Sequence, residues 1–281
     1  MSTRSHICVI RSRLKEISFD HIYFGTLFTW FEVARTEMGH AAGLPYVELE
    51  KNRIGSFVTA AGARYHRPIP AGATVAVEAR MADMGRARCS FAYAVFTGND
   101  ESPAVTGYTD HIAADFSGRP TRLPACFAEA FAPTGESIPR PSLEEPARVH
   151  WNTDLRVRYE ETDAFGVVYN GNYFAWMEAS WSEHLAENGM DVVEAFRQGR
   201  TYPVVEASCR FLSPLRYDDP VSIEVESRLE GRTRVALRYR FVAASTGVTA
   251  GIGQMVHAVV NKGRVVPVPR ELARALGITD S

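Results

Sequence analysis

Hydrophobic and polar positions follow two different periods along this chain, and these periods predict its elements. From residue 171 to 188, apolar residues recur every three or four positions, the spacing of a helix with one buried face. Residues 25–42 are predicted to form a second long helix. The stretch 234–242 alternates polar and apolar residues, as does an antiparallel strand with one covered face. Long helices followed by antiparallel strands are therefore expected.

The predicted elements occur twice in the same order: a short strand, the long helix, a series of strands and a short terminal helix. In the first half, the short strand and the terminal helix are predicted at 7–14 and 124–131. In the second half, the short strand is predicted at 153–160 and the terminal helix at 269–276. The strand series between them is predicted at 203–212, 219–230, 232–243 and 249–261. One apolar helix and about five strands predict an α+β layer in each half.

The repetition extends to single residues. With a shift of 146 positions, identical residues come into register without gaps, from Tyr23 with Tyr169 to His111 with His257. Other matched pairs are Gly25/Gly171, Phe28/Phe174, Trp30/Trp176, Glu32/Glu178, Arg64/Arg210, Pro68/Pro214 and Tyr93/Tyr239. One shift holding over this length indicates two tandem copies of one domain.

A change in composition separates the two copies. Residues 132–146 contain four prolines together with small and acidic residues, which is typical of a semi-extended linker. The predicted organisation is a first domain at 1–131, a Pro-rich linker at 132–147 and a second domain at 148–281.

Composition excludes several classes of protein. The chain has 31 Lys and Arg against 33 Asp and Glu, which argues against a nucleic-acid binder. Its four cysteines lie far apart, so neither a zinc site nor a disulfide framework is indicated. No apolar run reaches the roughly 20 residues that a membrane span needs. These features predict a cytoplasmic protein without a metal.

The stretch 159–174, YEETDAFGVVYNGNYF, carries the most specific motif. It resembles the signature of hotdog-fold acyl-CoA thioesterases of the 4-hydroxybenzoyl-CoA thioesterase type: aromatic–x–x–Thr-Asp, a Gly-containing turn, and Asn–x–x–Tyr entering the central helix. The resemblance covers roughly residues 150–262. It implies two tandem hotdog domains, each a long central helix wrapped by an antiparallel sheet of about five strands, packed as a pseudo-dimer.

The resemblance also implies a site. The family's catalytic acid falls on Asp163, as nucleophile or general base, and the backbone N–H near Asn170 would polarise the thioester carbonyl. Many members have His after the turn glycine, where this chain has Val167. The general acid for the leaving thiolate is therefore unassigned. Arg210 is a candidate for the phosphates of coenzyme A, because Arg binds phosphate well. The expected substrate-binding residues are Thr162, Gly166, Val167, Tyr169, Asn172, Tyr173 and Arg210.

Each candidate also has a structural interpretation. Asp163 could cap the following helix, which is the commonest use of Asp at such a place. Glu178 and its twin Glu32 lie in the middle of the helices, and a residue shared by both copies favours an architectural role over catalysis. The same reasoning makes His111 and His257 sheet residues.

The first copy lacks the acid at the matched position. With the constant shift, Ile17 stands where the second copy has Asp163. If three residues are instead deleted from this loop, Asp20 aligns with Asp163 and His21 follows it. Asp20 and His21 are therefore either a decayed site or a rearranged second site, and decay is favoured.

These features predict an acyl-CoA thioesterase that needs no cofactor and associates as a dimer of tandem units. The alternatives are an acyl-ACP thioesterase, a hydratase on the same fold, or a non-catalytic acyl-CoA-binding protein. A hydratase would be expected to use a His near the helix, and Val167 weakens that alternative.

Overall fold

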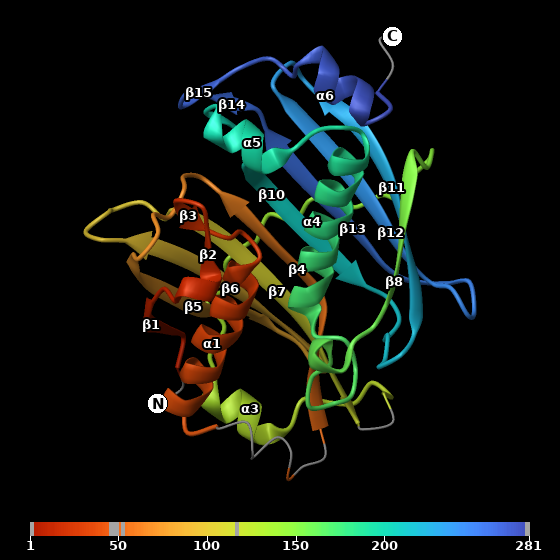
Figure 1. Cartoon of the computed structure of the whole chain (residues 1–281). Helices are drawn as coiled ribbons and strands as arrows, with labels where there is room; N and C mark the ends of the chain where they lie inside the picture. The colour runs from red at the N-terminus through yellow and green to blue at the C-terminus, as the bar shows by residue number, and fades with distance from the viewer. Residues whose placement is uncertain (1–2, 45–50, 52–53, 116–117, 279–281) are drawn as a thin grey trace. The chain divides into compact units, whose positions relative to one another are not determined.

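The computed structural model describes residues 3–44, 51, 54–115 and 118–278. The chain divides into two compact units, Met1–Arg140 and Pro141–Ser281. Within the described residues, each unit contains one long helix and one antiparallel sheet of five main strands (Figure 1). The same fold is therefore built twice in one chain.

In the first unit, the main strands follow the spatial order β1–β5–β6–β7–β4. Helix α1 (Thr26–Ala41) contacts β1 and β5. Its Phe31 ring stacks on Tyr93 of β6, with 4.4 Å between the ring centroids. The apolar face of α1 thereby becomes the core of this unit. The strands are β1 (Ser5–Arg11), β4 (Ile54–Tyr65), β5 (Thr74–Met84), β6 (Arg88–Thr97) and β7 (Val105–Asp115).

In the second unit, the order is β10–β13–β12–β11–β8. Helix α4 (Asn170–Glu187) buries one face that includes Phe174, Met177 and Leu185. The hydroxyl of Tyr239 on β12 donates to the carbonyl of Met177 at 3.2 Å, which fastens the helix to the sheet. The strands are β8 (Trp151–Arg156), β10 (Val204–Phe211), β11 (Pro220–Glu230), β12 (Arg234–Ala243) and β13 (Val248–Ala258).

Glycines in the sheets allow the helices to approach closely. A Cβ atom on Gly107 of β7 would lie 2.4 Å from the Phe31 ring of α1. A Cβ on Gly253 of β13 would lie 3.0 Å from the Met177 sulfur of α4. The two glycines are one repeat apart in sequence, so both copies meet the same packing requirement.

The predicted terminal helices are confirmed as α3 (Ala125–Ala130) and α6 (Arg270–Ala275). The predicted first strands extended too far, because β1 ends at Arg11 and β8 ends at Arg156. The 3₁₀ helices η1 (Leu14–Glu16) and η2 (Tyr159–Glu161) follow them. In each, the terminal glutamate accepts the backbone N–H of the N-cap residue, and this bond stabilises a turn in place of further strand.

Several short elements were not predicted. Helix α5 (Val192–Arg197) is capped by Asp191, whose side chain accepts the backbone N–H groups of Val193 and Glu194. The predicted strand at 249–261 divides into β13 and a short β14 (Val260–Asn261). Strand β14 pairs with β9 (Arg200–Thr201) and β15 (Arg264–Val265) in a small separate sheet.

Ion pairs anchor the segment that was predicted to be the linker. All of residues 132–146 are described, and none lies in a helix or strand. In the first unit, Glu136 pairs with Arg80 at 2.8 Å, and Arg140 pairs with Asp110 at 2.7 Å. In the second unit, two linker glutamates pair with arginines of β12: Glu144 with Arg238 at 2.5 Å and Glu145 with Arg240 at 3.2 Å.

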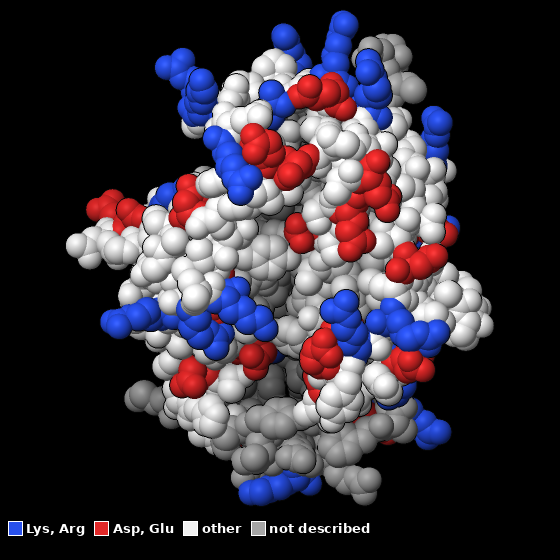
Figure 2. Space-filling model, viewed as in Figure 1, with Lys and Arg blue, Asp and Glu red and all other residues white. Residues whose placement is uncertain are grey.

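Charged side chains of both signs are interspersed over the face drawn in Figure 2, and the described residues form no continuous basic area there. This distribution agrees with the near balance of acidic and basic residues in the sequence. Among the described helices, none combines the length and the apolarity required to cross a bilayer.

Candidate active site

The loop between β8 and α4 is a tight hairpin that presents Asp163. The backbone N–H of Gly166 donates to the Asp163 carbonyl at 2.9 Å, and the N–H of Asp163 donates to the Val167 carbonyl at 2.8 Å. Gly166 has a φ of +68°, a conformation that glycine adopts without a steric penalty. This pattern is typical of a three-residue hairpin loop that ends on a left-handed glycine. Gly166 therefore shapes the turn.

The Asp163 carboxylate is half-buried and held by the backbone of its own turn. Its Oδ1 accepts the N–H of Phe165 at 2.9 Å. Burial raises the pKa of the Asp163 carboxyl, and backbone N–H groups of Phe165 and Val167 oppose this effect. A carboxylate with a raised pKa is a stronger base near neutral pH.

Asp163 does not cap α4. The N-cap residue is Tyr169, and its side chain makes no capping hydrogen bond. The first-turn amides of α4, those of Asn170 and Gly171, have no preceding helical carbonyl to bind. They carry the positive end of the helix dipole, which favours an oxygen that gains negative charge. The capping interpretation of Asp163 is thus wrong, since the carboxylate caps the turn before the helix.

Tyr169 and Gly171 form a matched pair at the helix start. A Cβ on Gly171 would lie 2.5 Å from Cε1 of the Tyr169 ring, so the ring fills the space of a side chain. In the first copy, a Cβ on Gly25 would lie 2.6 Å from the Tyr23 ring. This contact explains why both copies contain Tyr–x–Gly at this place.

Two other predicted site residues are engaged within the loop. The Thr162 hydroxyl donates to the Tyr159 carbonyl at 2.8 Å. The Asn172 side-chain amide donates to the Glu161 carbonyl at 2.7 Å. Asn172 therefore ties the helix start to the loop, whereas Thr162 stabilises the loop itself.

The remaining predicted residues differ in exposure. Val167 is partly exposed, and Arg210 is exposed on β10. Tyr173 is 3% exposed, and its ring contacts Phe211 and Phe241 with centroid distances of 4.9 Å in each case. Burial also raises the pKa of the Tyr173 hydroxyl. The structure thus brings Asp163 and the start of α4 into one loop–helix junction, with Tyr173 in the core behind it.

One residue of this junction was missed. Glu161 accepts the backbone N–H of Arg158 and the indole N–H of Trp176, both at 2.8 Å. In the first copy, Glu16 makes the same two bonds, to Arg13 and Trp30. Glu16 and Glu161 lie 145 positions apart, one fewer than the repeat shift of 146. A shared glutamate at this distance was the sequence signal that could have identified Glu161.

The comparison with known families decides the identity of the fold. The sequence profile of the thioesterase-like superfamily matches the chain twice, at residues 13–131 and 157–276. The chain belongs to this superfamily. The two matches bear out the predicted tandem repeat and the enzyme class, a thioester hydrolase.

Relatives of this superfamily match about one copy each. A putative esterase of Aquifex aeolicus is 29% identical over 121 residues, which cover 43% of this chain and 93% of that protein. A 1,4-dihydroxy-2-naphthoyl-CoA hydrolase of Prochlorococcus marinus is 28% identical over 113 residues, which cover 37% of this chain and 72% of that protein.

Two solved thioesterases match nearly the whole chain. A putative oleoyl thioesterase of Lactobacillus plantarum has a TM-score of 0.74 at 14% identity, covering 91% of this chain and 96% of that one. A 12:0-ACP thioesterase of Umbellularia californica has a TM-score of 0.73 at 11% identity, covering 91% and 94%. At such identities the likeness shows the fold alone, and it confirms the tandem hotdog fold.

The first copy of this thioesterase-like chain has a shorter hairpin at the matched place. Strands β2 (Ile17–Ser18) and β3 (His21–Ile22) pair Ser18 with His21 across a two-residue turn. In the second copy, the matching backbone pair is Asp163 with Val167. Ser18 therefore occupies the position of the acid, because the first turn is one residue shorter. The constant shift is right after the turn, where His21 matches Val167, and wrong before it, where it placed Ile17 at Asp163; the three-residue deletion is wrong at Asp20.

The two residues considered for a second site lie at this turn. The Asp20 carboxylate contacts the His21 ring Nδ1 at 2.8 Å, and its side chain is 76% exposed. His21 stands where the second copy has Val167. The structure thus joins Asp20 and His21 to each other, on a hairpin with the Ser18 hydroxyl in place of the Asp163 carboxylate.

The other titratable candidates lie within the core elements. Burial raises the pKa of the Glu178 carboxyl, while a hydrogen bond from Ser182 opposes the shift. Glu32 accepts the Thr36 hydroxyl at 3.0 Å. His111 and His257 are buried on β7 and β13, so the prediction that both are sheet residues is confirmed.

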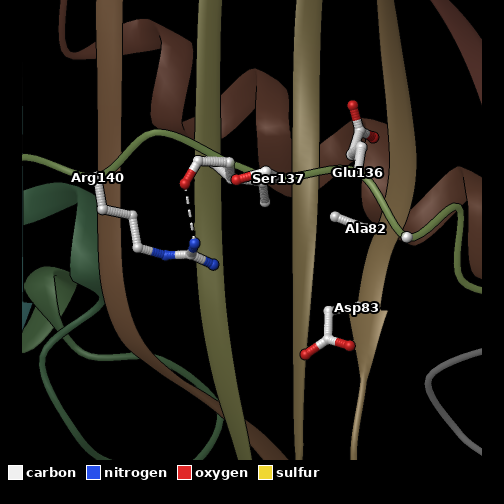
Figure 3. Close-up of a pocket in the computed structure, with 7 residues that line it drawn as sticks. Ala82, Asp83, Glu136, Ser137 and Arg140 are labelled. Carbon is white, nitrogen blue, oxygen red and sulfur yellow. Dashed lines mark hydrogen bonds between the residues drawn. The ribbon is translucent and has the colours of Figure 1, made fainter.

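Neither a cluster of metal ligands nor a pocket beside the linker alters this picture. In the described part of the chain, no group of three or more His, Cys, Asp or Glu could hold a metal ion. A polar cavity of about 280 Å³ lies between the linker and the sheet of the first unit (Figure 3). Its lining includes Asp83, Ser137 and Arg140, and Arg140 is already paired with Asp110.

Proposed function

We propose that this chain is an acyl-CoA thioesterase whose site lies at the start of α4. The observation that carries the proposal is the half-buried Asp163 carboxylate, held by its own turn just before a helix whose first amides are uncapped. The similarity to the 1,4-dihydroxy-2-naphthoyl-CoA hydrolase of Prochlorococcus marinus supports the choice of substrate class.

In the proposed reaction, the thioester carbonyl oxygen points at the Asn170 amide, which stabilises the negative charge of the tetrahedral intermediate. As general base, Asp163 takes a proton from water while the water oxygen attacks the carbonyl carbon. Collapse of the intermediate breaks the C–S bond, and the proton passes to the leaving thiolate. As nucleophile, Asp163 instead forms a mixed anhydride with release of the thiol, and water then hydrolyses the anhydride.

The surrounding residues take supporting roles in this proposal. Val167 and Tyr169 form the wall near the thioester, with the buried Tyr173 packed behind them, and Arg210 offers a cation for the coenzyme phosphates. Thr162, Gly166 and Asn172 keep the loop in shape. One competent site per chain is expected, because the first copy has Ser18 in the position of the acid. Association of two chains stays a prediction.

The test is replacement of Asp163 by Asn or Ala, assayed by release of free thiol from a panel of acyl-CoA substrates. Turnover is expected to fall by about 10²–10⁴-fold, the range that general acid–base catalysis contributes. Circular dichroism and the thermal midpoint serve as controls for folding. An Asp163 variant that keeps full turnover refutes the proposal.

Two further measurements distinguish the open alternatives. Single-turnover hydrolysis in ¹⁸O-labelled water places label in the Asp163 carboxylate only if that residue is the nucleophile. Assays with acyl-CoA and acyl-ACP carrying the same acyl group identify the carrier. Binding of acyl-CoA without thiol release would instead indicate a non-catalytic binding protein.

A further inference from the structure

The two parts of the proposed site lie on different elements, and one residue connects them. Asp163 belongs to the loop, whereas the Asn170 amide belongs to α4. The Glu161 carbonyl accepts the Tyr169 backbone N–H at 2.9 Å and the Asn172 side-chain amide at 2.7 Å. These bonds tie the residue two positions before the acid to the first turn of the helix.

The Glu161 side chain adds a second attachment. Its Oε1 accepts the Trp176 indole N–H at 2.8 Å, and its Oε2 accepts the Arg158 backbone N–H at 2.8 Å. Trp176 lies on α4 and is 5% exposed, so its indole is fixed by packing. Hydrogen bonds to an ionised carboxylate are stronger than neutral ones. Glu161, the last residue of η2, therefore bonds to the start of η2, to the first turn of α4 and to its second turn.

We propose that Glu161 is a positioning residue, which sets the distance between the Asp163 carboxylate and the Asn170 amide. This proposal rests on the proposed function. A misplacement of about 1 Å in a catalytic constellation can cost about 10²-fold in rate. The side chains of the two residues after Glu161 bond elsewhere: Asp163 bonds within its own turn and Thr162 bonds back to Tyr159.

The first copy contains the same connection without the acid. Glu16 accepts the Trp30 indole at 3.3 Å and the Arg13 backbone N–H at 2.7 Å, and its carbonyl accepts the Tyr23 N–H at 2.9 Å. Ser18 lies two residues beyond Glu16, as Asp163 lies two residues beyond Glu161. Glu16 therefore contributes to folding alone, which makes it a matched control for Glu161.

The experiment compares Glu161→Ala and Glu161→Gln with Glu16→Ala and Glu16→Gln in the full chain. Both alanine variants are expected to lower the thermal midpoint, and Glu16→Ala at least as much as Glu161→Ala, because Glu16 also pairs with the Arg13 guanidinium. Only Glu161→Ala is expected to lower kcat, by about 10–100-fold at a KM changed by no more than a few-fold. Gln has one acceptor oxygen for two donors, so Glu161→Gln should fall between Ala and the wild type.

The pH profile supplies a readout that a purely structural role would not move. Loosening the loop exposes Asp163 to water, so the acid limb of kcat/KM should shift to lower pH in the Glu161 variants and stay in place in the Glu16 variants. Trp176→Phe removes the indole donor alone. It should lower kcat in the same direction, and its effect should be less than additive with that of Glu161→Gln.

Equal kcat values for the Glu161 and Glu16 variants would overturn the proposal and leave Glu161 a folding residue. So would a loss of activity that only follows the fraction of folded protein. If Glu161→Ala does not fold, Glu161→Gln and Trp176→Phe carry the same comparison. Activity of Asp163→Asn is measured alongside, because its persistence would refute the proposed function, whatever the Glu161 variants do.

Discussion

Protonation of His257 should destabilise the folded protein below neutral pH. His257 is 3% exposed, and its Nδ1 lies 2.8 Å from the Tyr202 carbonyl, to which it can only donate. Its Nε2 has no hydrogen-bond partner among the described residues. A second proton would therefore place a buried, unpaired N–H in the core. Burial lowers the pKa of His257 from 6.5 to about 4.

The size of the effect follows from this shift. Because the pKa in the folded state is lower than in the unfolded chain, the contribution of neutral His257 to stability is complete above pH 6.5 and is lost as the pH falls towards 4. At about 1.4 kcal/mol per pKa unit, the loss is about 2 kcal/mol at pH 5 and about 3 kcal/mol at the acid limit. The Trp181 ring, stacked on His257 at 4.3 Å, offsets a part of this cost through a cation–π contact.

The assay is chemical denaturation at pH 7 and pH 5 of the wild type and of His257→Gln, followed by tryptophan fluorescence. All other titrating groups, His111 included, are common to the two proteins, so the difference between their pH dependences isolates His257. The wild type should lose about 2 kcal/mol more than the variant over this interval. Identical pH dependence would refute the reasoning.

Two further predictions concern the active-site loop. Gly171→Ala forces the Tyr169 ring away from a Cβ at 2.5 Å, and should cost about 1–3 kcal/mol of stability and lower kcat. Gly25→Ala should lower stability by a similar amount with little change in kcat. If Gly171→Ala changes neither the thermal midpoint nor the turnover, the prediction is contradicted. Because the pKa of Asp163 is raised, the acid limb of kcat/KM should lie above the ordinary range of an aspartate and disappear in any residual activity of Asp163→Asn. A limb at or below the ordinary value would contradict that assignment.

The main elements could be predicted because local patterns determine them. The three/four spacing around Trp176 placed the long helix within one residue at each end, and the repeat placed its twin. The packing reason for the shared glycines became visible only in the structure. Gly107 and Gly253 face helices that lie far away in sequence, and Gly171 faces a ring two residues away.

The loop of the first copy could not be aligned from sequence. A one-residue difference between two hairpin turns changes which residues pair, and the one marker of the shift was Glu16, which matches Glu161 at 145 positions and not 146. The anchoring of the linker was equally hidden, because the proline pattern predicts an extended chain whether or not Glu136 and Arg140 find partners. The cap at Asp191, in contrast, was a readable local signal.

The short hairpin of the first unit determines what a chain with two active sites would require. Ser18→Asp would restore the carboxyl group but not its surroundings, because Phe19 and Asp20 form a turn one residue too short to copy that of the second unit. The amides of Phe165 and Val167, which hold the carboxylate, come from the longer turn. Redesign would need the whole loop 162–168 transplanted in place of 17–22. A second site in the first unit therefore requires an insertion as well as a substitution.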